Sequence, residues 1–301
     1  MIDMLLRLYP ATYRRTYGPE IADVYRESTR GASAPTRLRE AAGIVGHAVR
    51  LRLGLGSAGS LGALLKIAAP YAMVAAAVAT ALRFGWWLSG IWVGWEAHGA
   101  GAFPFTSLEL GVADGLLAAT HLLVMVGAVT AFSGRWAAGA RLTVAGLLAS
   151  TLAMVLFQGV HNDPVVLSTA AALLAAGVIW ACPPDAPPAP AATRTAGVVA
   201  LVAWLPPAAV HSGLLAVTTD YGAWPLLVLA VTGCVLAVRA GSNGVRELTA
   251  MALACAPLAA LSHWMWAGQP GPVLAGLALL PLAVLPAAAV RVLRRPRASA
   301  D

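Results

Sequence analysis

The stretch "IAAPYAMVAAAVATALRFGWWL" (residues 67–88) contains one charged residue, Arg83, in an otherwise apolar run. A helix needs about 20 mostly apolar residues to cross the hydrocarbon core of a bilayer, and this stretch meets that requirement. Seven more apolar runs follow it, at 111–132, 142–160, 165–182, 196–217, 223–238, 248–267 and 272–290. The sequence therefore predicts an all-α integral membrane protein with eight transmembrane helices.

The composition supports this fold class and argues against several soluble ones. Of the 301 residues, 59% are hydrophobic and only 11% are charged, whereas a soluble domain carries about 25% charged residues. The sequence has no phosphate-binding P-loop, no dinucleotide-binding glycine fingerprint and no G-x-S-x-G nucleophile motif, so we predict a non-enzymatic protein. The first long apolar run begins near Ile67, too late for a secretory signal peptide, and we expect the N-terminus to be retained.

The positions of the basic residues predict the orientation. If the N-terminus is cytoplasmic, the inside segments are 1–66, 133–141, 183–195, 239–247 and 291–301, and they hold 19 of the 20 Lys and Arg residues. The exception is Arg83, which we expect to reach the membrane interface from the end of the first span. This distribution follows the positive-inside rule and predicts that both termini lie in the cytoplasm.

Tryptophan and acidic residues mark the opposite side of the predicted bundle. Acidic residues occur at the outer loops and helix ends: Glu96, Glu109, Asp114, Asp163 and Asp220. Tryptophans gather at the same boundary, as in an interfacial aromatic belt: Trp86, Trp87, Trp92, Trp95, Trp224, Trp264 and Trp266. We expect the segment 84–95 to extend the first helix or to lie along the outer leaflet.

The segment before the first span has a different character, as "LLRLYPATYRRTYGPEIADVYRE" (5–27) shows. Its glycines and prolines predict four short helices, Ile2–Tyr9, Pro10–Tyr17, Pro19–Gly31 and Thr36–Leu53, with a break at Gly18 and Pro19. A small core is expected from Leu5, Leu6, Leu8, Tyr13, Tyr17, Ile21, Val24 and Tyr25, covered by a last helix whose apolar face is Leu38, Ala42, Val45 and Val49. The predicted organisation is a module over 1–55, a linker over 56–66, the bundle over 67–290 and a basic tail over 291–301.

The same segment resembles the permease prefix domain, an N-terminal helical module of bacterial membrane proteins similar to the HAAS-type domains encoded near PadR-like repressors. The matching positions are Leu8, Tyr9, Pro10, Tyr13, Arg14, Tyr17, Gly18, Glu20 and Ile21. The resemblance covers roughly residues 1–55 and implies a protein of the bacterial cytoplasmic membrane whose module docks a transcription regulator or an ABC transporter subunit. It brings no catalytic residue with it.

We assign the expected partner-docking surface to seven residues of this module: Tyr9, Tyr13, Arg14, Arg15, Tyr17, Glu20 and Arg26. An alternative is that the arginine-rich helices simply bind anionic lipid at the membrane surface, worth about 1 kcal/mol per basic residue. Direct nucleic-acid binding is not expected. The function predicted from the sequence is therefore that of a membrane regulatory or accessory protein, in contact with the bilayer and with a cytoplasmic protein.

A second function, transport or binding of a small or proton-coupled solute, follows from ionisable residues in the predicted spans. Such residues are costly in a bilayer and mark functional sites by default. The candidate cavity residues are Asp114, His121, His211 and His263, of which the first two lie seven residues apart on one helix face. Metal or haem binding and plain interhelical hydrogen bonding are alternatives. Because HxxxH, HExxH and CxxC spacings are absent, we predict no metal and no cofactor, and we expect Cys182, Cys234 and Cys255 to be buried thiols.

Overall fold

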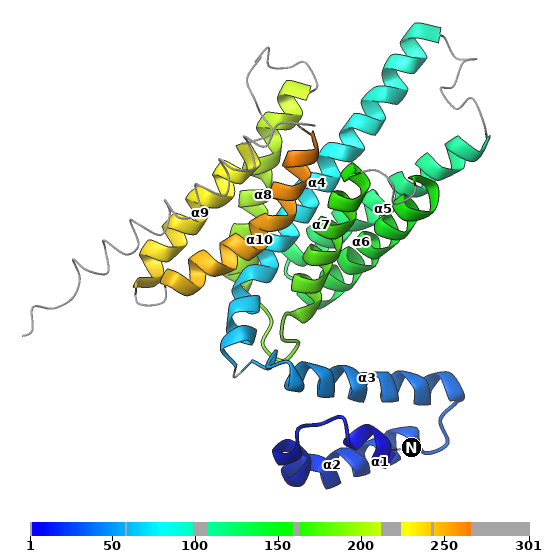
Figure 1. Cartoon of the computed structure of the whole chain (residues 1–301), viewed down its shortest axis with the longest axis vertical. Helices are drawn as coiled ribbons and strands as arrows, with labels where there is room; N and C mark the ends of the chain where they lie inside the picture. Colours follow the sequence, from blue (N-terminus) through cyan, green and yellow to red (C-terminus); the bar gives the residue numbers. More distant parts are fainter. Residues whose placement is uncertain are drawn as a thin grey trace, which may run out of the picture. The chain divides into compact units, whose positions relative to one another are not determined.

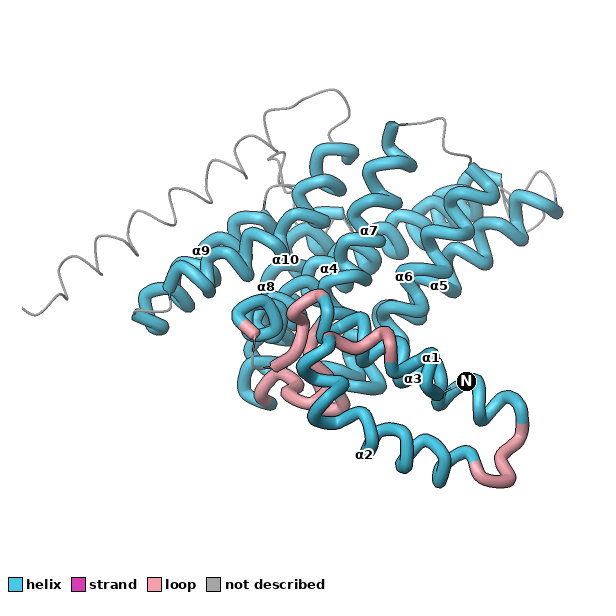
Figure 2. The backbone as a smooth tube through the Cα atoms, turned by 60° about the horizontal axis from the view of Figure 1, so that its bottom comes forward, coloured by secondary structure: helices cyan, strands magenta, loops and turns pink. Residues whose placement is uncertain are grey.

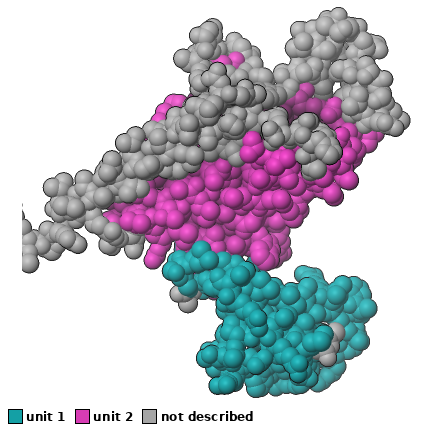
Figure 3. All heavy atoms as spheres, viewed as in Figure 1, with its two compact units in different colours: residues 1–63 teal, residues 64–301 magenta. Residues whose placement is uncertain are grey.

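The computed structural model describes residues 2–57, 59–98, 108–158, 163–211, 224–241 and 244–265. Within these ranges every regular element is a helix, and no strand occurs (Figure 2). The all-α prediction is therefore confirmed. The chain divides into two compact units, Met1–Ala63 and Leu64–Asp301, which Figure 3 shows in different colours.

Unit 1 contains three helices, α1 (Ile2–Leu6), α2 (Ala11–Thr29) and α3 (Ala34–Arg52) (Figure 1). The chain reverses between α2 and α3 at Gly31, whose φ of 72° lies in the left-handed region that glycine adopts without a steric penalty. The core of the unit is a cluster of buried and half-buried apolar side chains: Ile2, Leu5, Leu6, Ala22, Tyr25, Ala41 and Ile44.

The predicted break at Gly18 and Pro19 is wrong, because α2 runs through both residues as one helix. The buried stripe of α2, Gly18, Ala22 and Tyr25, crosses the proline at helical spacing, so packing against α1 and α3 favours a continuous helix. Pro19 cannot donate to the carbonyl of Arg15, but both residues lie on the exposed face, where water can satisfy that carbonyl.

The predicted core of the module is also wrong in part. The face of α3 that turns inward carries Ala41, Ile44 and Ala48, and Leu38 is 73% exposed. On α2, Tyr17 and Val24 are exposed as well. Both faces have apolar residues at helical spacing, and the neighbouring helices cover only one of them.

Unit 2 contains the first seven of the predicted spans as helices among its described residues, while 272–290 and the tail at 291–301 lie outside them. The helices are α4 (Ser60–His98), α5 (Leu108–Phe132), α6 (Trp136–Gln158), α7 (Asp163–Ala181), α8 (Pro190–His211), α9 (Trp224–Ala240) and α10 (Gly244–Met265). Helix α4 starts inside the predicted linker, at Ser60.

Among the residues that the structure describes, four segments are long and apolar enough to cross a membrane: Ser60–Gly85, Val112–Phe132, Trp136–Phe157 and Pro190–Val210. Two shorter apolar helices, Val165–Ala181 and Trp224–Ala240, accompany them. Exposed leucine, valine and phenylalanine side chains occur along α5, α6 and α8, and such surfaces are stable in lipid. The chain is a helical membrane protein.

Helix α4 is the central helix of unit 2. Its segment from Ala68 to Ala76 is buried throughout, and α4 passes between α5–α7 and α8–α10 (Figure 1). Alanine dominates this segment, and small side chains allow neighbouring helices to approach closely. The helix continues without interruption to His98. Of the two alternatives predicted for 84–95, the structure therefore has the extension of the first helix.

Helices α5 and α6 form a tightly packed hairpin with a turn at Gly134, whose φ is 102°. Three glycines lie at their contact. A Cβ atom on Gly127 would lie 2.5 Å from Oγ1 of Thr143, one on Gly146 would lie 2.7 Å from Cγ2 of Val124, and one on Gly139 would collide with backbone atoms of Ala131 and Gly127. Helices α5 and α6 can therefore approach this closely only because these three positions have no side chain.

Candidate functional site

A groove of about 490 Å³ lies in unit 1 between α2 and α3. We call it the tyrosine groove, because all four tyrosines of the unit contribute to its walls. Its lining consists of Tyr9, Tyr13, Tyr17, Glu20, Ile21, Val24, Tyr25, Ser28, Glu40, Gly43, Ile44 and His47.

Three of these rings form a continuous aromatic stack. Tyr9 and Tyr13 stack with ring centroids 5.5 Å apart and planes 11° from parallel, and Tyr13 lies 4.7 Å from Tyr17. Tyr13 and Tyr17 lie four residues apart on one face of α2, and Tyr9 lies just before that helix. The ring of His47 meets Tyr9 and Tyr13 edge-on at 5.6 and 5.9 Å. The rings support one another, so the wall of the groove is formed before any ligand binds.

Hydrogen bonds fix one end of this stack. The hydroxyl of Tyr9 donates to the carbonyl of Ile44 at 3.4 Å and lies 3.1 Å from Nδ1 of His47, which joins the start of α2 to α3. Burial raises the pKa of Tyr9 above its ordinary value, and the neighbouring Tyr13 contributes to the same shift. Both effects favour the neutral phenol that the hydrogen bond requires.

The other end of the groove has an unsatisfied polar atom. Tyr25 is 6% exposed, and its hydroxyl is buried without a hydrogen-bond partner among the described residues. A buried hydroxyl without a partner costs about 1–3 kcal/mol. Because Tyr25 lines the groove, a ligand that supplies an acceptor or donor at this depth would remove the cost.

The charges that line the groove are acidic. Glu20 and Glu40 are among its lining residues, and no Lys or Arg is found among those that the structure describes there. Arg14, Arg15 and Arg26 lie away from the lining, and Arg26 pairs with Asp23 at 2.8 Å on the surface. The three predicted docking arginines are therefore not part of the groove lining.

The seven predicted docking residues thus divide into two sets. The structure brings Tyr9, Tyr13, Tyr17 and Glu20 together in the groove and leaves the three arginines outside it. Sequence reasoning missed the contribution of α3, which supplies Glu40, Ile44 and His47. Their spacing of four and then three residues places them on one helical face, and this signal was available in the sequence.

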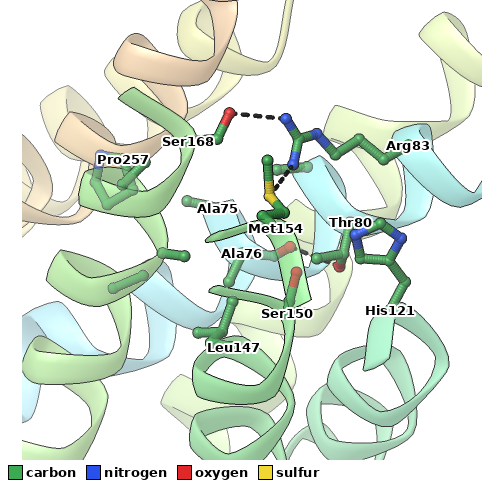
Figure 4. A pocket seen from close by; sticks show the side chains of 14 residues that line it. Ala75, Ala76, Thr80, Arg83, His121, Leu147, Ser150, Met154, Ser168 and Pro257 are labelled. Atoms are coloured by element: carbon green, nitrogen blue, oxygen red, sulfur yellow. Dashed lines mark hydrogen bonds between the residues drawn. The ribbon is translucent and has the colours of Figure 1, made fainter. Parts of the chain in front are cut away.

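A second candidate site lies within unit 2, where α4, α5, α6, α7 and α10 enclose a small cavity of about 50 Å³ that we call the polar pocket (Figure 4). Its walls combine small apolar residues with a few polar ones. The lining is Ala75, Ala76, Ala79, Thr80, Arg83, His121, Leu147, Ser150, Met154, Ser168, Ala171, Ala172, Ala175 and Pro257.

Arg83 joins three helices at this pocket. Its Nη2 donates to Oγ of Ser168 on α7 at 2.7 Å, and its Nη1 donates to Sδ of Met154 on α6 at 3.5 Å (Figure 4). The hydroxyl of Thr80 donates to the carbonyl of Ala76 at 2.7 Å. His121 is 4% exposed, and its Nε2 is buried without a partner in the described part of the chain. Arg83 thus contacts α6 and α7, and its expected reach to the membrane interface stays a prediction.

Of the four predicted cavity residues, Asp114, His121, His211 and His263, the structure describes the side chains of Asp114 and His121. His121 lines the polar pocket, whereas Asp114, two turns earlier on α5, is not among its lining residues. The side chains of His211 and His263 lie outside the described residues. Among the described residues, no group of three or more His, Cys, Asp and Glu side chains is placed to hold a metal ion. Cys182 and Cys255 are buried, and Cys234 is half-buried.

Comparisons with protein families, with curated proteins and with solved structures found no match to this chain. The resemblance of residues 1–55 to the permease prefix domain therefore stays a prediction, and the function must be argued from the two sites.

Proposed function

We propose that this chain is a non-enzymatic regulatory or accessory protein of the bacterial cytoplasmic membrane whose N-terminal unit docks a soluble protein through the tyrosine groove. The partner we expect is a transcription regulator or an ABC transporter subunit that presents an amphipathic segment with at least one Lys or Arg side chain. The observation that carries the proposal is the preformed aromatic groove with an unsatisfied buried hydroxyl in its lining.

The chemistry of the groove favours a cationic segment. Tyrosine faces attract Lys and Arg side chains by about 0.5–2 kcal/mol, depending on desolvation, and Glu20 and Glu40 add charge complementarity. Aromatic side chains are the usual anchors of protein interfaces, because they bury a large area at a low entropic cost. A purely lipid-binding surface would instead be formed by the arginines, which are not among the lining residues of the groove.

The proposal includes the topology. Eight transmembrane helices with both termini inside would place unit 1 in the cytoplasm, where soluble regulators and ATPase subunits are found. The support is the distribution of Lys and Arg, since 19 of 20 fall in the segments assigned to the inside. The apolar stretch 272–290 supplies the eighth span in this arrangement.

Site-specific photocrosslinking in the native host tests the docking surface. A photoreactive amino acid at Tyr17, which lines the groove and is 45% exposed, should crosslink a cytoplasmic protein. The same amino acid at Leu38, exposed but outside the groove, should not. We expect the crosslinked peptide of the partner to contain Lys or Arg, as mass spectrometry would show.

A matched pair of charge reversals gives the control. Glu40→Lys should abolish the crosslink from position 17, whereas Glu27→Lys, at an exposed glutamate outside the groove, should leave it unchanged. If both variants lose the crosslink to the same extent, the loss reflects the changed net charge of the unit and not the groove. If full-length protein and a variant lacking residues 1–55 capture the same set of proteins, the unit binds only the membrane surface and the proposal is wrong.

A further inference from the structure

We propose that helix α3 binds a bilayer surface rich in anionic lipid, with one exposed face of the helix inserted among the lipids. This contact goes beyond the docking function, which uses another face of the same helix. The inference depends on an exposed apolar stripe, on the arginines beside it and on the short connection from α3 to the first membrane-spanning segment.

The stripe consists of apolar residues at helical spacing along α3. At 3.6 residues per turn its members lie within about 60° of one another around the helix: Leu38, Ala42, Val45 and Val49. Leu38 is 73% exposed, Ala42 and Val49 are exposed as well, and Val45 is half-buried. The stripe is therefore not the face with which α3 packs in unit 1.

Arginines flank the stripe on both sides. Arg39 lies on one side of it around the helix, and Arg37 and Arg52 lie on the other. The side chains of Arg37 and Arg52 donate to backbone carbonyls at 2.9 and 3.0 Å, which are neutral partners. Glu40, the acidic residue of α3, lies on the opposite face from the stripe. The charge beside the stripe is therefore positive.

This arrangement fits the surface of a membrane. An amphipathic helix with basic residues beside its apolar face lies in the interface, with that face about 5–10 Å into the boundary between headgroups and acyl chains. Arginine stems can follow the apolar surface while the guanidinium groups reach the phosphates. Because the flanking charges are positive, anionic lipid is the favoured surface.

The connection to unit 2 keeps α3 near a bilayer. Helix α3 ends at Arg52, and the first segment able to span a membrane begins at Ser60. At about 3.3–3.6 Å per residue, the chain over 53–59 reaches at most roughly 25 Å. Such a tether raises the effective concentration of the helix at the lipid surface, so a weak contact is sufficient.

The same contact would orient the tyrosine groove. Glu40 and His47 line the groove, and both lie on the side of α3 opposite to the stripe. With the stripe inserted among lipids, the groove would open toward water, where a soluble partner can reach it.

Spin labels on the two faces of α3 test this inference in the full-length protein. Nitroxides are attached to Leu38→Cys, Val49→Cys or Glu40→Cys, with the native cysteines replaced by alanine, in nanodiscs that contain phosphatidylglycerol. Collision rates with oxygen, which is concentrated in lipid, and with a water-soluble nickel chelate give the depth of each label. We expect the labels at 38 and 49 about 5–10 Å below the phosphates and the label at 40 in water.

Two charge variants, read from the label at position 38, make the result specific. Arg39→Gln should lower the ratio of inserted to free label about fivefold, which corresponds to the loss of about 1 kcal/mol for one basic residue at an anionic surface. Arg141→Gln, at an exposed arginine on α6, should leave the ratio unchanged. Nanodiscs of phosphatidylcholine alone should lower the ratio for the wild-type arginines as well.

Two outcomes overturn the inference. One is that the labels at 38 and 49 meet the nickel chelate as readily as the label at 40. The other is that they are shielded from both reagents, because a protein surface, such as a second copy of the chain, would then cover the stripe. Neither outcome affects the docking proposal, which is tested from Tyr17 in the groove.

Discussion

The close packing of α5 against α6 leads to a prediction in which one type of substitution has opposite effects at two glycines. Gly139→Ala introduces a Cβ atom that would collide with the backbone nitrogen of Ala131 and the carbonyl oxygen of Gly127. Backbone atoms cannot rotate away, so the two helices must separate. Gly177→Ala, on α7, introduces the same atom into open space, with nothing within 4 Å.

The expected magnitudes follow from these contacts. Inserting a methyl group into a well-packed contact costs about 1–3 kcal/mol. Alanine is favoured over glycine in a helix interior by about 1 kcal/mol, and this gain is the only effect expected at Gly177. Because the same propensity gain applies at Gly139, the two variants should differ in free energy of unfolding by the clash alone, about 1–3 kcal/mol. Gly146→Ala should fall between them, because its nearest contact is a methyl group of Val124 that can shift.

The assay is reversible unfolding of the full-length protein in mixed micelles, with the mole fraction of dodecyl sulfate increased and helicity followed by circular dichroism. The midpoint of Gly139→Ala should lie below that of the wild-type protein, and the midpoint of Gly177→Ala at or above it. If Gly139→Ala unfolds at the wild-type midpoint, α5 and α6 are not in contact through glycine and the described packing is refuted.

Three further predictions concern the groove and the topology. Tyr25→Phe removes the buried hydroxyl that has no partner among the described residues, and it should stabilise unit 1 by about 1–3 kcal/mol. Slower amide hydrogen exchange in α2 would show this gain, and partner capture should weaken if the partner satisfies this hydroxyl. The raised pKa of Tyr9 means that its contribution to stability is complete below pH 10.0 and is lost as the pH rises through the folded-state value. The tyrosinate absorbance that Tyr9→Phe removes should therefore appear above pH 10.0, and a midpoint at or below that pH would contradict the burial of Tyr9. The orientation is tested with a membrane-impermeant maleimide in a background in which the native cysteines are replaced by alanine. Asp185→Cys should react only in opened vesicles, whereas Asp220→Cys should react in intact cells. The reverse pattern would overturn the proposed orientation.

The sequence predicts unit 2 well because its helices depend on properties visible in a single chain. Long apolar runs separated by short polar loops form helices wherever the backbone must satisfy its own hydrogen bonds, as it must in lipid. Seven runs reappear as α4 to α10 in the same order. Which helix lies at the centre was not predictable, because all seven are apolar on every side and burial of α4 depends on tertiary packing.

In unit 1 the local signals and the tertiary packing disagree. Glycine followed by proline usually marks the end of a helix, yet α2 continues because Gly18, Ala22 and Tyr25 are buried on one face across Pro19. Likewise, Leu38 and Val49 have the spacing of a core face, but α3 buries Ala41, Ile44 and Ala48 instead. A sequence specifies that a helix is amphipathic more reliably than it specifies which of two apolar faces is covered.

The polar pocket shows how an exception to a sequence rule can mark a site. Arg83 was the one basic residue outside the predicted inside segments, and the spacing within a helix paired His121 with Asp114. The hydrogen-bond partner of Arg83, Ser168, lies 85 residues away on α7, so no periodicity within one helix could have linked the two. The residue that breaks the positive-inside pattern is therefore the one that joins α4 to α6 and α7 by hydrogen bonds, and we expect exceptions of this kind to mark polar contacts in other helical bundles.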